Sequence, residues 1–139
     1  MPARFPARFA VALCAAALAG CAANPPAGPC AAQETVMVND LIFLGTDSPA
    51  GPVSEQAWED FLRLSVTPRF PQGLTAWRAA GQWRGNDGAI VREPSFVLDL
   101  VHPEDAASER AVRELQAEYK TRFQQEATLR VKQHACESF

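Results

Sequence analysis

The sequence predicts an α+β domain in which two helices cover one face of a four-stranded antiparallel sheet. Two observations favour this fold class. Stretches with strand and helix patterns follow one another in the order β-α-β-β-α-β, which is the ferredoxin-like pattern. In addition, Cys30 precedes the first expected strand and Cys136 follows the last. That topology makes these two strands antiparallel neighbours, so it brings the two cysteines together.

The first expected strand and helix occupy the start of the domain. Residues 36–44 are mostly apolar or β-branched and are followed by Gly45, which is typical of a strand. Ser54 suits the N-cap of the helix that follows. Pro68 ends this helix, because proline disfavours helical geometry in the residue before it. The apolar residues that fall on one face of the helix are Trp58, Phe61, Leu62 and Val66.

A hairpin is expected next. Its strands are residues 74–84 and 89–101, and a Gly-Asn-Asp-Gly turn signal separates them. Trp77 and Trp83 fall on the same face of their strand. If Arg84 pairs with Ala89 across this turn, Trp77 faces Phe96 and Trp83 faces Ile90. An aromatic stripe of this kind usually belongs to the core, so we expect both tryptophans to pack beneath the helices.

The second helix and the last strand complete the pattern. The helix is expected after Pro103, which suits a first helical turn. Its apolar stripe contains Val112, Leu115, Tyr119 and Phe123. The last strand is expected in residues 127–133. It alternates, with Leu129 and Val131 expected to face inward and Arg130 and Lys132 outward.

Residues 1–20 have the pattern of an export signal. Two arginines precede a charge-free apolar stretch, which is shorter than the ~20 residues that a membrane-spanning helix needs. The stretch ends in Leu-Ala-Gly-Cys, which resembles the lipobox of bacterial lipoproteins. This resemblance implies a mature chain that starts at Cys21, carries lipid there and is anchored in the cell envelope. Ala22 after the cysteine favours the periplasmic face of the outer membrane. The alternative is an alanine-rich leader, containing a chance cysteine, that the general signal peptidase removes.

The remainder of the chain divides into a tether and one domain. Residues 21–33 are rich in Pro, Gly and Ala and have no apolar period, so we expect a flexible tether. Residues 34–139 are enough for a single globular domain with one hydrophobic core. The formal net charge is −3, and no basic stripe is present, so nucleic acid is not an expected partner.

The cysteines suggest a disulfide. The leader contains Cys14, and lipid would occupy Cys21, which leaves Cys30 and Cys136 in a compartment that permits oxidation. The alternatives are two free thiols or a metal site that includes His134. We expect no metal, because His134 and Cys136 alone supply too few ligands for zinc.

Three sequence motifs point to a known family. They are Val-Thr-Pro-Arg-Phe-Pro-Gln-Gly-Leu-Thr at 66–75, Gly-Gln-Trp at 81–83, and Tyr-Lys-Thr-Arg-Phe-Gln-Gln-Glu at 119–126. In this order they resemble a family of uncharacterised bacterial lipoproteins that is defined as a domain of unknown function. The resemblance covers about residues 40–131 and implies an exported single domain. It brings no known activity, cofactor or catalytic residue.

The sequence carries few signs of catalysis. It has no Gly-rich phosphate loop, no cysteine pair at zinc spacing and no Gly-x-Ser-x-Gly motif, so we expect no cofactor. His102 and His134 fall at the ends of expected elements and lack an obvious partner, so we expect both at the surface.

Arg69 is the first candidate binding residue. It lies between two prolines on a stiff loop, where it could present its guanidinium to a carboxylate or phosphate. The alternative is a structural role, in which Arg69 bonds the carbonyls left open at the end of the first helix.

The uncovered face of the sheet is the second candidate, because a ferredoxin-like sheet has helices on one face only. We expect this face to be a polar binding platform in which Arg78 and Glu93 are diagonal neighbours. The side chains assigned to it are Arg78, Gln82, Glu93, Asp99, Arg130 and Lys132.

Two functions remain open. The favoured one is a non-catalytic envelope lipoprotein whose uncovered sheet face binds a partner protein, a ligand or a second copy of the chain. The alternative is a small periplasmic enzyme in which Arg69 and Glu93 serve as anion clamp and acid/base. The absence of a nucleophile–base pair in the sequence counts against the enzyme.

Overall fold

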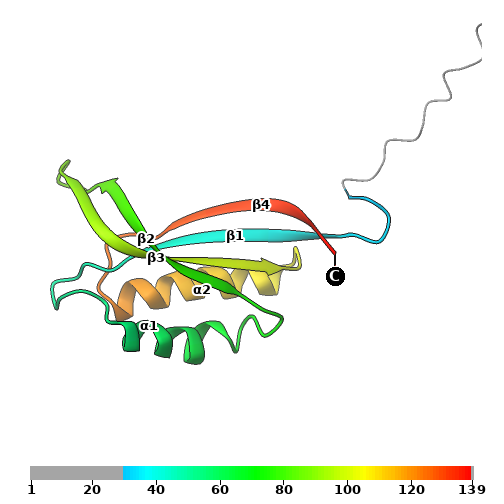
Figure 1. Ribbon diagram of the computed structural model, residues 1–139, viewed down its shortest axis with the longest axis horizontal. Helices are drawn as coiled ribbons and strands as arrows, with labels where there is room; N and C mark the ends of the chain where they lie inside the picture. The colour runs from blue at the N-terminus through cyan, green and yellow to red at the C-terminus, as the bar shows by residue number, and fades with distance from the viewer. Residues whose placement is uncertain (1–29, 139) are drawn as a thin grey trace, which may run out of the picture.

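The computed structural model describes residues 30–138, and the predicted leader, Cys21 and most of the tether lie outside this part. The elements are β1 (Thr35–Gly45), α1 (Glu55–Phe61), η1 (Leu62–Val66), β2 (Thr75–Arg84), β3 (Ile90–His102), α2 (Ala106–Arg122) and β4 (Leu129–Glu137). The strands form a four-stranded sheet in the order β2-β3-β1-β4, and every neighbouring pair is antiparallel. Figure 1 shows both helices on one face of this sheet. The predicted ferredoxin-like α+β fold is confirmed.

The hydrophobic core lies between the sheet and the two helices. On β1 and β3 the side chains that face the helices are buried at alternate positions, as the period of two requires. Tyr119 and Phe61 meet edge to face, with ring centroids 5.2 Å apart, where α1 crosses α2. The core contains Ile42, Leu44, Trp58, Phe61, Val66, Phe70, Phe96, Leu98, Leu100, Val112, Leu115 and Tyr119.

The first helix begins as predicted but ends in an unexpected way. The Ser54 hydroxyl accepts a hydrogen bond from the Ala57 N–H at 3.2 Å and so caps α1. The last turn widens into the π-helical segment η1, in which the Thr67 N–H donates to the Leu62 carbonyl at 2.9 Å. The widened turn ends before Pro68, as the sequence predicts.

The β2–β3 register differs by one residue from the prediction. Arg84 pairs with Ile90, because Ala89 belongs to the turn, where its carbonyl accepts a hydrogen bond from the Gly85 N–H at 2.9 Å. Trp77 therefore pairs with Val97 and lies on the uncovered face, 44% exposed. The prediction that both hairpin tryptophans lie beneath the helices is wrong.

The orientation of β4 is also the reverse of the prediction. Leu129 and Val131 pair with Phe43 and Leu41 on the uncovered face, where they are 59% and 42% exposed. Arg130 points instead towards the helix layer. It does so because Asp40 of β1 and Glu109 of α2 neutralise it on that side of the sheet, as described below. Side chains alternate between the two faces along a strand, so an Arg130 that faces the helices places Leu129 and Val131 on the uncovered face.

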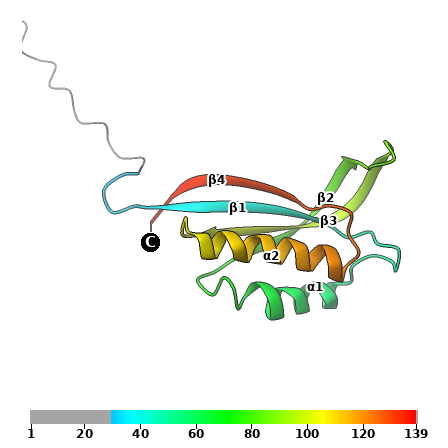
Figure 2. The same ribbon diagram turned by 180° about the vertical axis from the view of Figure 1, so that it is seen from behind.

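A disulfide joins the two ends of the domain. Cys30 and Cys136 are bonded, with their Cα atoms 5.5 Å apart, at the end of the sheet where β1 begins and β4 ends. In both views this end lies opposite the turn of the β2–β3 hairpin (Figures 1 and 2). No helix in residues 30–138 is both long and apolar enough to cross a membrane.

Candidate functional site: a pocket on the uncovered sheet face

The β2–β3 hairpin rises from the sheet, away from the helices (Figure 2). The uncovered face is hollowed beside this hairpin. The hollow is a pocket of about 480 Å³. Its walls come from the end of β1, from β2 and β3, and from the segment between α2 and β4. This volume falls within the ~300–1,000 Å³ typical of small-molecule sites.

Small side chains of β2 create the hollow. Ala79 and Gly81 line it opposite Ser95 and Glu93, their partners on β3. A Cβ atom at Gly81 would make ordinary contacts with β3, 3.5 Å from the Ser95 hydroxyl oxygen and 3.6 Å from the Glu93 carbonyl oxygen. Phe43 and Leu129, which pair across β1 and β4, add apolar surface.

Glu93 is the charged side chain of the pocket. Its Oε2 atom accepts hydrogen bonds from the backbone N–H groups of Thr46 at 2.9 Å and Asp47 at 2.8 Å. Its Oε1 atom accepts a hydrogen bond from the Trp83 indole N–H at 3.1 Å. These three donors hold the carboxylate in one orientation and dock the half-buried indole against it.

Gly45 leaves room for this corner, and Tyr119 supports it from the helix side. A Cβ atom at Gly45 would lie 2.5 Å from the Glu93 Oε1 atom, so glycine leaves the space that the carboxylate occupies. The Tyr119 hydroxyl donates to the Gly45 carbonyl at 2.9 Å. Burial raises the pKa of Tyr119 well above its ordinary value, and the negative charge of Glu93 adds to this. Tyr119 therefore stays a neutral hydrogen-bond donor.

Gln125 forms the wall after α2. Gln124 adopts a positive φ of 50° and turns the chain towards the pocket. The Gln125 side-chain amide donates to the carbonyls of Asp47 at 2.8 Å and Phe123 at 3.2 Å. Its N–H groups are thus used by the backbone, and its carbonyl oxygen remains an acceptor.

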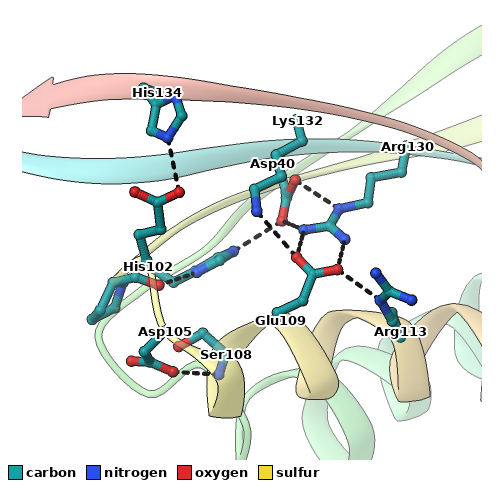
Figure 3. Close-up of polar contacts among 11 residues, drawn as sticks. Asp40, His102, Asp105, Ser108, Glu109, Arg113, Arg130, Lys132 and His134 are labelled. Atoms are coloured by element: carbon teal, nitrogen blue, oxygen red, sulfur yellow. Dashed lines mark hydrogen bonds and ion pairs between the residues drawn. The ribbon is translucent and has the colours of Figure 1, made fainter.

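A second polar cluster lies between α2 and the sheet (Figure 3). Asp40 is completely buried at its centre. Its carboxylate accepts hydrogen bonds from Arg130 at 2.8 and 2.5 Å and lies 2.9 Å from the Nε2 atom of His102. Arg130 also donates to Glu109 at 2.8 Å, and Lys132 approaches the same carboxylate at 3.2 Å.

This cluster is structural. Its side chains satisfy one another, and none of these five residues lines the pocket. Arg130, helped by Arg113, holds the pKa of Glu109 far below its usual range. The network ties α2 to β1 and β4 across the edge of the core. The prediction that His102 lies at the surface is wrong, because this residue belongs to the network and is only 4% exposed. His134 is exposed as predicted, although it does have a partner, Glu104, at 3.0 Å.

Arg69 has the structural role that the sequence left open. Its guanidinium donates to the Ser65 carbonyl at 2.6 Å and lies 3.0 Å from the Glu118 carboxylate of α2. It therefore bonds a carbonyl at the end of the broken helix and ties this end to α2. The pocket of Glu93 is on the other face of the sheet, so the structure does not bring Arg69 and Glu93 into one site.

The other predicted surface residues do not form one polar platform, and that prediction is wrong. Arg78 faces the helices and pairs with Glu55, instead of meeting Glu93. Arg130, with Lys132, belongs to the helix-side network. Asp99 lies on the uncovered face, where it accepts a hydrogen bond from Asn39. The pocket is bordered by Gln82, which bonds Arg92, and by Glu93.

Sequence reasoning missed most of the pocket. Leu129, for example, was expected to face inward, but it lines the pocket on the uncovered face. One signal was available, because two of the three motifs that suggested a family, at 81–83 and 119–126, meet at this corner. Their separation in the sequence hides the fact that β2 and the end of α2 face the same hollow.

The fold and the pocket define a small ferredoxin-like α+β domain with a ligand-sized hollow on its uncovered face. A family model described as "Protein of unknown function (DUF3574)" matches residues 39–139, and the chain belongs to this family. No curated protein matches the chain.

Solved structures that resemble the fold include the following two. A phage SAM lyase in complex with S-methyl-5'-thioadenosine is 16% identical, with a TM-score of 0.58, over 74% of this chain and 90% of that one. CutA from Synechococcus elongatus PCC7942, complexed with Bis-Tris, is 13% identical, with a TM-score of 0.51, over 76% of this chain and 87% of that one. At these identities the similarity supports the fold alone.

Proposed function

We propose that this protein is a lipid-anchored envelope lipoprotein that acts as a non-catalytic binding module through its uncovered sheet face. The observation that carries this proposal is the character of that face. Trp77, Leu129 and Val131 expose large apolar side chains on it, and the pocket opens at its hairpin end. An apolar surface of this kind marks an interaction site, because leaving it in water is unfavourable.

The chemistry of this face favours an apolar contact. Leu41 and Phe43 lie between Val131 and Leu129 on one side and the β3 strand on the other, so the apolar residues adjoin one another. The arginine and lysine of β4 point away from this face. Desolvating it on contact with an envelope protein or a second copy therefore displaces water mainly from hydrocarbon groups.

The enzyme alternative has lost its main support. It needs Arg69 and Glu93 in one site, but Arg69 is engaged by Ser65 and Glu118 in the helix layer. Glu93 is itself held by three N–H donors. A binding role needs neither a free nucleophile nor a base.

The position of the disulfide supports one orientation of the domain on the proposed anchor. From Cys21 to Cys30 the chain reaches at most ~30 Å. Cys30 is bonded at the end of the sheet opposite the hairpin, and the 11 residues of β1 lead from there towards the pocket. The anchor would therefore hold the disulfide end near the membrane, with the pocket directed away from it.

A charge placed on the uncovered face tests the binding surface. In the full-length, lipidated and C-terminally tagged chain, Val131→Asp should abolish a co-purifying envelope partner or a homodimer. Leu64→Asp is the matched control, because Leu64 is an exposed apolar residue, 56% exposed, on the helix side of the domain. Co-purification and sedimentation from detergent extracts read out both forms of binding. Equal binding by wild type, Val131→Asp and Leu64→Asp would exclude this face.

A further inference from the structure

We propose that the pocket beside Glu93 binds a small molecule that combines a protonated amine with an apolar or aromatic body. The inference rests on the proposed binding role of the uncovered face and names the class of ligand for its hollow end. It follows from the charge, the free hydrogen-bonding capacity and the apolar lining of the pocket.

The charge favours a cation. Among the described residues that line the pocket, Glu93 is the single acidic side chain, and none is a lysine, arginine or histidine. Arg92, the neighbour of Glu93 in sequence, donates to Gln82 at 2.9 Å. A carboxylate or phosphate ligand would therefore enter a site of like charge without a counter-ion. A protonated amine would find an ion pair in a partly desolvated setting.

The hydrogen-bonding capacity of Glu93 is not exhausted. A carboxylate offers about four acceptor positions, and backbone and indole donors fill three of them at this residue. The remaining position matches one N–H of an amine. The carbonyl oxygen of Gln125 is a second acceptor in the wall, because its amide N–H groups are directed to the backbone.

The lining of the pocket selects an apolar body. Phe43, Leu129 and the half-buried ring of Trp83 border the hollow, and Ala79 and Gly81 leave it open. An aliphatic or aromatic group would replace water against these side chains, and the aromatic rings favour a nearby cation.

The test compares three probes with similar apolar bodies: 2-phenylethylamine, 2-phenylethanol and 3-phenylpropionate. They are titrated into the full ¹⁵N-labelled chain, kept in solution with a non-ionic detergent. The resonance of the Trp83 indole N–H is the reporter, because this group bonds Glu93 directly. We expect a saturating shift with the amine. The alcohol and the acid should bind at least about tenfold more weakly, the factor expected for one charge-assisted hydrogen bond.

Two variants separate charge from shape. Glu93→Gln should reduce the affinity for the amine to that for the alcohol, while Gly81→Val should fill the hollow and abolish binding of both. Gly81→Val keeps the test decisive if Glu93→Gln fails to fold. Ala135→Val, on the same face near the disulfide, is the control and should bind like wild type.

Equal affinities of wild type for the amine and the acid, or no shift with any probe, would overturn the inference. So would full amine binding by Gly81→Val. These outcomes leave the proposed function standing if Val131→Asp still loses its partner. If Leu64→Asp also loses that partner, the result would instead count against the proposed binding surface. It would leave the inference about the pocket unchanged.

Discussion

Gly45 and Glu93 show how one missing side chain shapes the site. The carboxylate occupies the space where a Cβ atom of residue 45 would stand, and from there it reaches three N–H donors. The φ of Gly45 is not positive, so glycine is needed here for the close approach of the Glu93 carboxylate and not for its backbone conformation.

Gly45→Ala should destabilise the domain by about 1–3 kcal/mol, because the new methyl group displaces the carboxylate from its charge-assisted hydrogen bonds. Chemical denaturation measures the change in the free energy of unfolding. Gly81→Ala is the matched control, since its Cβ atom would make only ordinary contacts, the nearest at 3.5 Å. Equal stability of Gly45→Ala and Gly81→Ala would contradict this account.

At the residue scale, local signals were predicted and distant partners were not. The Ser54 cap was foreseen because it depends on residues three positions apart. His102 was placed at the surface because its partner, Asp40, is 62 positions away in the sequence. A buried polar side chain looks like an exposed one until the fold supplies its hydrogen bonds.

At the scale of the elements, ion pairs between side chains join β4 to α2. Arg130 of β4 joins Asp40 of β1 to Glu109 of α2. The strands β1, β2 and β3 were predicted to within a residue or two at each end, because they alternate or are continuously apolar. For β4 the alternation was predicted correctly, but its apolar side chains were expected on the covered face and lie on the uncovered one. A period of two does not say which face of a strand is covered.

The ion network predicts a specific loss of stability in acid. Arg130 lowers the pKa of Glu109 in the folded state, so its contribution to stability is complete above the ordinary glutamate pKa of about 4.3. That contribution is lost as the pH falls below this value towards the folded pKa. Between pH ~6 and ~2 the wild type should therefore lose more free energy of unfolding than Glu109→Gln does.

Urea unfolding at a series of pH values measures this difference. Glu114→Gln, an exposed change on the same helix, should follow the wild type. Parallel curves for wild type and Glu109→Gln would show that the Arg130–Glu109 pair does not stabilise the fold.

At the scale of the whole molecule, the disulfide and the pocket lie at opposite ends of the sheet. A chain anchored through its N-terminus would be held by one end and would present the other. This arrangement suits a module that meets its ligand or partner away from the lipid surface.

Cys21→Ala tests the anchor. If lipid is attached at this residue, the variant should move from the membrane fraction towards the soluble fraction, because a protein without acyl chains lacks stable hydrophobic anchoring. Fractionation followed by immunoblotting measures the distribution, and Cys14→Ala, within the predicted leader, is the matched control. An unchanged distribution of Cys21→Ala would contradict the lipoprotein assignment.

The sequence by itself determined the order of the elements and favoured the Cys30–Cys136 bond over its alternatives, because periodicity, turn residues and strand order are local or topological properties. Tertiary structure alone decided which face of each strand is covered. It buried Arg130 against Asp40 and Glu109, left Val131 and Leu129 exposed, and opened a pocket beside Glu93. The physical reason is that burial depends on partners that are distant in sequence. One ion network on the helix side therefore decides which face of the whole strand β4 is covered.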